Sequence, residues 1–163
     1  MTVDDEVTSV FEDAREDVYR YMLTLGLDPG KAQEAAQEVF LRFYLERRKG
    51  VEIEKPRAWV FRVAHNLGLD CRAKERLQPL DAALEATLED PRLSIDMALI
   101  RDERMAQIGE AWKTLSPQQR QCLHLRAEGL KYAEIGETLG ISISTVREFL
   151  TRAIARLQKA AHE

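Results

Sequence analysis

Apolar side chains recur at steps of three and four residues along most of this sequence, a spacing that predicts amphipathic helices. The first half contains three such segments, at about 7–25, 31–48 and 57–76. Asp28 can cap the second helix, with Pro29 at its first position. A strand-like alternation of apolar and polar residues occurs nowhere, so every element of the fold is expected to be helical.

The second half resumes the helical spacing near Ile95. Ser116 and Pro117 are suited to begin a helix that Gly129 ends. The stretch 130–157 then predicts a short helix, a turn at Gly140 and a longer helix capped by Ser142 or Ser144. The inner face of that last helix is expected to consist of Val146, Leu150, Ala153 and Leu157.

The segment between the two halves has a different composition. Residues 77–94 contain two prolines and a cluster of acidic side chains, which indicates a linker between domains. We therefore expect an all-α protein of two small helical domains, 1–76 and 96–163, joined by an acidic linker at 77–95.

The charge is distributed unevenly, although the whole chain has a formal net charge of -4. Residues 1–17 contain seven acidic side chains against Arg15, whereas 42–76 contain ten lysines and arginines against five acids. The last helix is also rich in arginine. Because salt screens exposed charges within about 10 Å, local charge governs contact with phosphates. Two basic regions therefore suit a protein that contacts DNA at two places.

Several classes of protein are disfavoured by composition. No apolar run reaches the length of a membrane span, and the acidic first residues are unlike a secretory signal, so we expect a cytoplasmic protein without membrane insertion. Cys71 and Cys122 are expected to be buried reduced thiols, and the histidines lack the spacing of metal ligands. We expect no metal, cofactor or catalytic residue.

Helix, glycine turn and longer helix is the arrangement of a helix-turn-helix, whose second helix enters the DNA major groove. A simple helical hairpin is the alternative. In the segment 57–76, Trp59, Arg62, His65 and Asn66 offer stacking surfaces and phosphate contacts for unpaired bases. Alternatively, Trp59 lies in the core and the arginines only face solvent; residue spacing alone leaves both interpretations open.

Taken together, the two halves resemble the sigma factors of bacterial RNA polymerase, specifically the two-domain extracytoplasmic-function (ECF) group. The resemblance covers roughly Phe11 to Leu157. Residues 37–42, Gln-Glu-Val-Phe-Leu-Arg, resemble the family's polymerase-binding helix, and residues 55–67 resemble the helix that melts and reads the minus-ten element. Residues 115–120 and the helix-turn-helix resemble the module for the minus-thirty-five element.

The resemblance implies a protein that is not itself an enzyme but directs core RNA polymerase to promoter DNA. It implies contacts with the polymerase clamp and flap regions, passage of the acidic linker through the polymerase channel that RNA later occupies, and an anti-sigma factor as a further partner. The implied polymerase-binding residues are Gln33, Glu34, Gln37, Glu38, Phe40 and Arg42. The implied minus-ten residues are Arg47, Arg48, Lys49, Lys55, Arg57, Trp59, Arg62, His65 and Asn66. The implied minus-thirty-five residues are Ser144, Thr145, Arg147, Glu148, Thr151 and Arg152.

The sequence departs from the family pattern at four positions. Lys31 stands where the family commonly has Asp, and Gly136 stands where Ala is usual. The glycine costs about 1 kcal/mol in helix propensity. Glu148 and Phe149 replace small polar and basic residues, so upstream recognition is altered or weakened. Two rival functions remain: a sigma mimic that sequesters an anti-sigma factor, and a LuxR-type activator, whose DNA-binding module resembles only 115–157.

Overall fold

The computed structural model describes residues 2–76 and 103–162, and these residues fall into two compact units that we describe separately. Every regular element among them is an α-helix, as the hydrophobic spacing predicts. The expected linker at 77–95 and residues 96–102, the expected start of the second domain, lie outside the described residues. In the described part of the chain, no helix is both long and apolar enough to cross a membrane.

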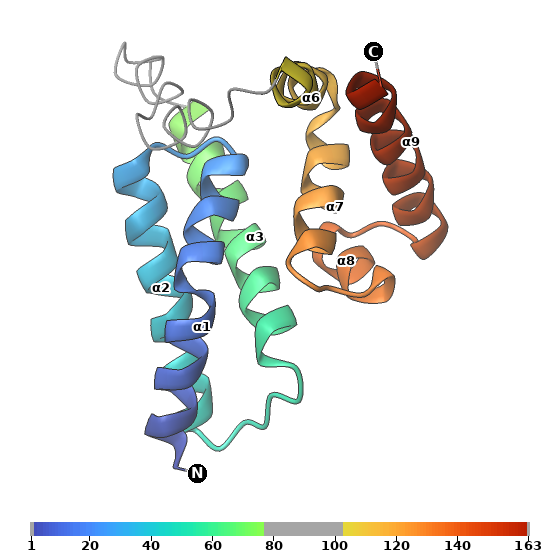
Figure 1. Ribbon diagram of the computed structural model, residues 1–163. Coiled ribbons are helices and arrows are strands. Elements are labelled where there is room, and N and C mark those ends of the chain that lie inside the picture. Colours follow the sequence, from blue (N-terminus) through green and yellow to red (C-terminus); the bar gives the residue numbers. More distant parts are fainter. Residues whose placement is uncertain (1, 77–102, 163) are drawn as a thin grey trace. The chain divides into compact units, whose positions relative to one another are not determined.

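The first unit consists of α1 (Val3–Thr24), α2 (Pro29–Arg48) and α3 (Pro56–Arg76), each packed against the other two (Figure 1). The predicted cap at Asp28 is confirmed, because its carboxylate accepts a hydrogen bond from the backbone N–H of Lys31 at 2.8 Å. Such a bond satisfies one of the donors that the first turn of a helix leaves unpaired. The core is lined by apolar residues from all three helices, including Val18, Met22, Val39, Phe43, Val60 and Phe61.

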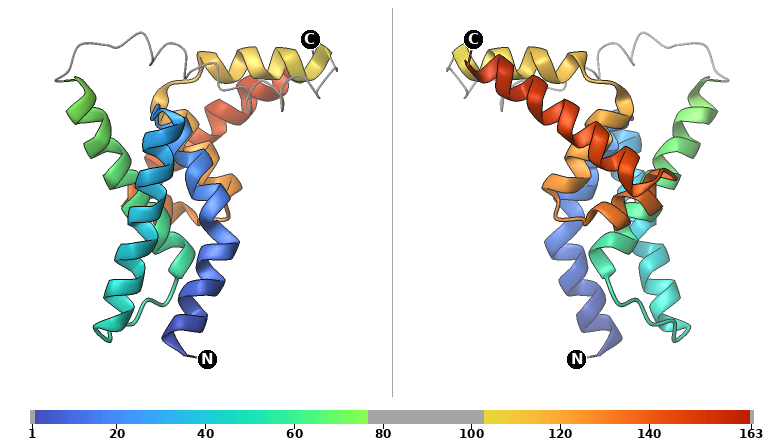
Figure 2. Two further views of the ribbon diagram at one scale, coloured as in Figure 1. Left: turned by 90° about the vertical axis from the view of Figure 1, so that its left-hand side faces the viewer. Right: turned by 90° about the vertical axis from the view of Figure 1, so that its right-hand side faces the viewer.

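The second unit consists of α6 (Glu103–Thr114), α7 (Pro117–Ala127), α8 (Tyr132–Leu139) and α9 (Ile143–His162). The long helix α9 packs against each of the other three, and two further views show its course along the unit (Figure 2). Ser116 forms a reciprocal capping box with Gln119 at the start of α7, as its position next to Pro117 predicts.

The turn between α8 and α9 has the predicted form. Gly140 ends α8 with φ 71° and ψ 34°. This is the left-handed conformation that glycine adopts without a steric penalty. Val146, Leu150 and Ala153 are buried, as expected, and Leu157 is half-buried. α8, the turn at Gly140 and α9 therefore form the predicted helix-turn-helix.

The expected burial of the two cysteines is only partly right. Cys122 in α7 is fully buried, and burial raises the pKa of its thiol to about 11. Cys71 in α3 is half-buried, because it lies toward the edge of the stripe of α3 that faces the core.

Candidate nucleic-acid interface

The polar residues expected to bind polymerase lie together along the outer face of α2. Gln33 and Gln37 are one helical turn apart, as are Glu34, Glu38 and Arg42. All five side chains are exposed or half-buried, and Arg42 Nε lies 3.2 Å from Glu38 Oε1. We call these five residues the α2 face.

Phe40, the sixth residue expected in that group, lies elsewhere. It is buried, and its ring packs edge-on against Phe11 of α1 with the centroids 5.2 Å apart. Position 40 belongs to the stripe of α2 that faces the core, so the structure does not place Phe40 beside the other five residues.

Two leucines that sequence reasoning missed extend the α2 face. Leu41 and Leu45 are 50% and 47% exposed, respectively. They continue the line from Glu34 and Glu38 at steps of three and four residues. Counting positions outward from Glu34 would have identified them. An apolar patch beside polar groups is typical of a surface that binds another protein.

Lys31, the first departure from the family pattern, connects α2 to α3. Its Nζ lies 2.8 Å from Glu75 Oε1, and this hydrogen bond raises the pKa of the lysine. Both residues line a hollow of about 340 Å³ between the two helices, which Glu34 and Glu38 also border. The cation at position 31 therefore supports one end of the α2 face through an ion pair with α3.

Arg47 and Arg57, expected at DNA, are instead paired with acidic residues of α1. Arg47 Nη2 lies 2.8 Å from Glu6 Oε2, and its Nη1 donates to the Val51 carbonyl at 2.6 Å. Arg57 lies 3.2 Å from Asp13 and 2.8 Å from Asp17, and it also stacks on the ring of Phe61. These arginines hold the loop and the start of α3 against α1.

The other basic residues of this region are more exposed. Arg48 lies over the ring of Tyr44, 5.8 Å from its centroid, and Lys49 lies 3.4 Å from Glu46. Lys55 is exposed in the loop immediately before α3. All three cations can approach a phosphate without disturbing the core.

Along α3, the structure brings together three of the four residues expected to contact unpaired bases. Trp59 is half-buried, with its ring 5.5 Å from that of Phe43, so one part packs while another remains accessible. Arg62 and Asn66 are exposed and follow Trp59 at steps of three and four residues. We call Trp59, Arg62 and Asn66 the α3 stripe.

The fourth residue, His65, is not part of this surface. Its side chain is only 4% exposed, and its Nδ1 is 2.8 Å from the hydroxyl of Tyr21 in α1. Burial lowers its pKa to about 4, so the ring is neutral at pH 7. The structure therefore separates His65 from the α3 stripe, because α3 contacts both other helices and buries a wide face.

The start of α9 presents polar side chains to solvent. Ser142 caps the helix by accepting the N–H of Thr145 at 3.1 Å, and its hydroxyl lies 2.9 Å from that of Thr145. Ser144, Arg147 and Thr151 are exposed on the side away from the core. This decides between the two serines that the sequence left open as the cap, and it leaves Ser144 free to face a ligand.

Glu148 and Arg152 form an ion pair on the outside of α9. Arg152 Nη2 lies 2.7 Å from Glu148 Oε1, and the arginine and glutamate side chains are 66% and 54% exposed, respectively. The acid therefore lies beside a cation that could otherwise bind a phosphate. Phe149 is half-buried, so only part of its ring is accessible to DNA.

Gly136 in α8 is required by the turn. A Cβ added there would lie 2.8 Å from the backbone oxygen of Ile141, closer than real Cβ atoms approach such an atom. The residue that weakens the helix by propensity thus allows α8 to pack closely against the turn.

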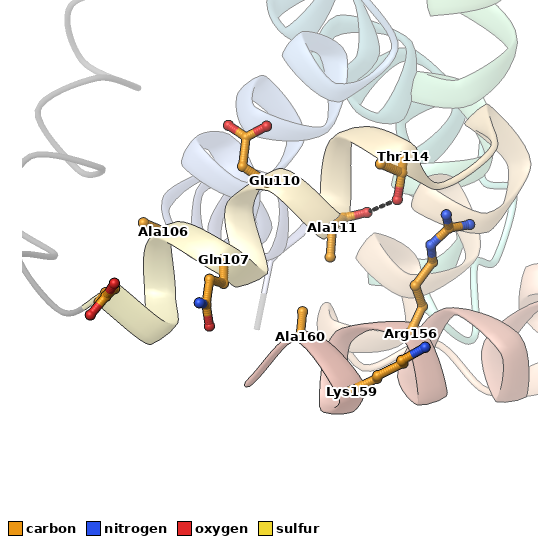
Figure 3. Close-up of a pocket in the computed structure, with 9 residues that line it drawn as sticks. Ala106, Gln107, Glu110, Ala111, Thr114, Arg156, Lys159 and Ala160 are labelled. Carbon is orange, nitrogen blue, oxygen red and sulfur yellow. Dashed lines mark hydrogen bonds between the residues drawn. The ribbon is translucent and has the colours of Figure 1, made fainter. Parts of the chain in front are cut away.

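A second hollow, of about 550 Å³, lies between α6 and the end of α9 (Figure 3). Its α6 wall contributes Glu103 and Glu110, and its α9 wall contributes Arg156 and Lys159. Ala106, Ala111 and Ala160 also line it, and the Thr114 hydroxyl donates a hydrogen bond to the Ala111 carbonyl at 2.6 Å.

Comparisons with known families match both units. The model for Sigma-70 region 2 matches residues 10–77, and the model for Sigma-70, region 4 matches residues 105–157. The two matches together span well over half of the chain and occur in the order that the sequence predicts.

Curated relatives agree with these matches. The ECF RNA polymerase sigma factor SigK of Mycobacterium sp. (strain KMS) is 26% identical over 161 residues, covering 94% of this chain and 82% of its own length. SigK of Mycobacterium tuberculosis (strain ATCC 25618 / H37Rv) is 26% identical over 156 residues, covering 91% and 81%, respectively.

Two solved structures share the fold at low sequence identity. The sigma factor RpoE in complex with the anti-sigma factor NepR from Bartonella quintana has a TM-score of 0.63 and 18% identity, covering 95% of this chain and 96% of that chain. CnrH in complex with the cytosolic domain of CnrY has a TM-score of 0.61 and 18% identity, covering 96% and 87%, respectively.

Proposed function

This chain belongs to the sigma-70 family, in its ECF group of RNA polymerase sigma factors, and on that premise we propose how its two units direct promoter-specific initiation. The chain supplies promoter specificity in the cytoplasm, and the bond-forming chemistry is that of the polymerase. One observation carries the proposal: two sigma-70 modules occur in order in a chain whose α2, α3 and α9 each expose polar side chains.

The α2 face is proposed to bind the polymerase clamp. Gln33, Glu34 and Gln37 offer exposed hydrogen-bonding groups, and Leu41 with Leu45 adds apolar area that becomes buried on binding. Phe40 acts indirectly, because its packing on Phe11 fixes α2 against α1.

The α3 stripe is proposed to hold the non-template strand at the minus-ten element. Stacking of a base on an aromatic ring contributes about 1–3 kcal/mol, and this compensates for the cost of unstacking the base from the duplex. The exposed part of Trp59 can stack, Asn66 can read a base edge, and Arg62 can pair with a phosphate. Arg48, Lys49 and Lys55 add positive charge nearby, whereas Arg47 and Arg57 act by positioning the loop and α3.

The start of α9 is proposed to read the minus-thirty-five element in the major groove. Ser144, Arg147 and Thr151 are exposed there, and the guanidinium group of an arginine such as Arg147 can bind a guanine with two hydrogen bonds. Thr145 acts mainly through the helix cap, and Arg152 reaches phosphate only in competition with Glu148.

We also propose that an anti-sigma factor regulates this chain, since one of the solved structures of similar fold is a sigma factor in complex with an anti-sigma factor. A sigma mimic would bind such a partner without binding core polymerase. A LuxR-type activator would bind duplex DNA without core polymerase, and such a function would not account for the region 2 match at residues 10–77.

The α2 face can be tested by measuring the affinity of fluorescently labelled protein for purified core polymerase. Leu41→Ala combined with Glu34→Ala should weaken binding by at least about tenfold, because the two changes remove apolar area and a polar contact. Leu69→Ala, at a leucine of α3 that is 45% exposed, is the control and should bind like wild type. Wild-type protein without measurable affinity for core polymerase would contradict the proposed function.

A further inference from the structure

Ile143 is an exposed apolar residue at the very start of α9. Its side chain is 48% exposed, and Arg147, one helical turn later, is exposed as well. The core face of the helix is formed by Val146, Leu150 and Ala153, so Ile143 is not needed to anchor it. The core therefore does not account for an isoleucine at this position.

The position of Ile143 matches that of a base-reading residue. In a helix-turn-helix, side chains at the N-terminal end of the second helix contact base edges in the major groove. Ile143, Arg147 and Thr151 follow one another at four-residue steps, so a duplex that meets Arg147 lies within reach of Ile143. Among the groups in the major groove, the C5-methyl of thymine is the one that an aliphatic side chain recognises.

We propose that Ile143 is a specificity-determining residue that contacts the C5-methyl group of a thymine in the upstream promoter element. The inference rests on the proposed entry of α9 into the major groove, and it adds an apolar contact to the polar ones assigned there. It names the feature that is read, a methyl group, which neither the helix-turn-helix plan nor the family match specifies.

Ile154 provides a matched control in the same helix. It is also an exposed isoleucine, at 41%, but it lies eleven residues further on. At about 1.5 Å per residue this places it about 16 Å along the helix axis from Ile143, too far for both to contact the same base.

The first experiment selects promoters with the holoenzyme, reconstituted from core polymerase and the full chain. A duplex library with a randomised upstream element is selected with wild type, Ile143→Ala and Ile154→Ala. We expect a thymine preference at one position that is lost with Ile143→Ala and retained with Ile154→Ala. If the selected element shows no thymine preference, or a preference that Ile143→Ala retains, the inference is overturned. The role of α9 stays intact in that case.

The second experiment replaces that thymine with deoxyuridine, which lacks only the methyl group. Wild type should bind about fourfold more weakly, the change that corresponds to about 0.8 kcal/mol for one buried methyl group. Ile143→Ala should bind the two promoters equally. Equal affinity of wild type for both promoters, or undiminished discrimination by Ile143→Ala, overturns the inference. If wild type selects no upstream element at all, the proposed role of α9 also fails.

Discussion

Replacing Glu148 with Gln should tighten binding to the upstream promoter element while leaving the fold almost unchanged. The carboxylate forms an exposed ion pair with Arg152 at 2.7 Å. Exposed pairs one helical turn apart contribute only about 0.3 to about 0.5 kcal/mol to folding. The carboxylate has a larger effect on the free energy of DNA binding. A carboxylate about 7 Å from a phosphate in water is repelled by about 0.6 kcal/mol, which is roughly threefold in affinity.

The change should also make binding more dependent on salt. Once released from Glu148, Arg152 can neutralise one further phosphate, which steepens the dependence of log affinity on log salt by about 0.9. The gain at about 50 mM salt should therefore exceed that at about 200 mM by roughly three- to fourfold. The assay is fluorescence anisotropy of labelled promoter duplex bound by reconstituted holoenzyme, measured across this range.

A matched control separates the local effect from that of net charge. Glu110→Gln removes the same charge from an exposed pair with Lys113 in α6, whose distance is 3.3 Å. We expect this control to leave the salt dependence unchanged. If Glu148→Gln instead weakens binding, with the loss confined to promoters that have a cytosine at one position, Glu148 reads that base and the electrostatic reasoning is refuted.

Gly136→Ala should destabilise the second unit, because the new Cβ meets a backbone oxygen at 2.8 Å. The expected loss in thermal unfolding is about 1–2 kcal/mol, and a higher melting temperature would mean that helix propensity outweighs this contact. The buried His65 has a pKa of about 4, lowered from 6.5, so the first unit should lose stability as pH falls through this range. The loss should reach about 3 kcal/mol at most. With His65→Gln, the free energy of unfolding, measured with denaturant at several pH values, should no longer show this loss. An unchanged pH dependence would show that other groups cause the loss. Trp59→Ala combined with Asn66→Ala should impair open-complex formation, measured by permanganate reactivity, by about 1–3 kcal/mol per lost stacked base. If these two substitutions lower core affinity instead, the assignment of the α3 stripe is wrong.

The helices and their ends could be predicted because the signals that set them are local. Asp28 and Ser116 cap their helices through hydrogen bonds to residues three positions away, and Gly140 ends α8 with its own backbone conformation. Such interactions depend on sequence neighbours alone. The order of the two modules could be predicted for a related reason, because each carries a contiguous motif.

The structure differs from the picture given by local reasoning where the partners of a residue are distant in sequence. Arg57 pairs with Asp17, forty residues away, and His65 hydrogen-bonds to Tyr21, forty-four residues away. A basic or polar residue next to a predicted DNA-contacting tryptophan looks the same in sequence whether it faces nucleic acid or another helix. Only the packing of α3 against α1 separates the two cases.

Gly136 shows a further limit of local reasoning. Propensity assigns glycine a cost within a helix. The approach of the turn backbone to 2.8 Å of an added Cβ nevertheless makes the small residue necessary. The restricting atom belongs to Ile141, beyond the helix, so no propensity scale includes it.

Transcription in vitro from purified components tests the central claim most directly. The full chain is mixed with core polymerase and a promoter selected by the holoenzyme, without any other sigma factor. The account predicts a transcript with one defined start that requires this chain and decreases with both Arg147→Ala and the substitutions in the α3 stripe. Failure to initiate at any promoter, although the chain is folded, would contradict it.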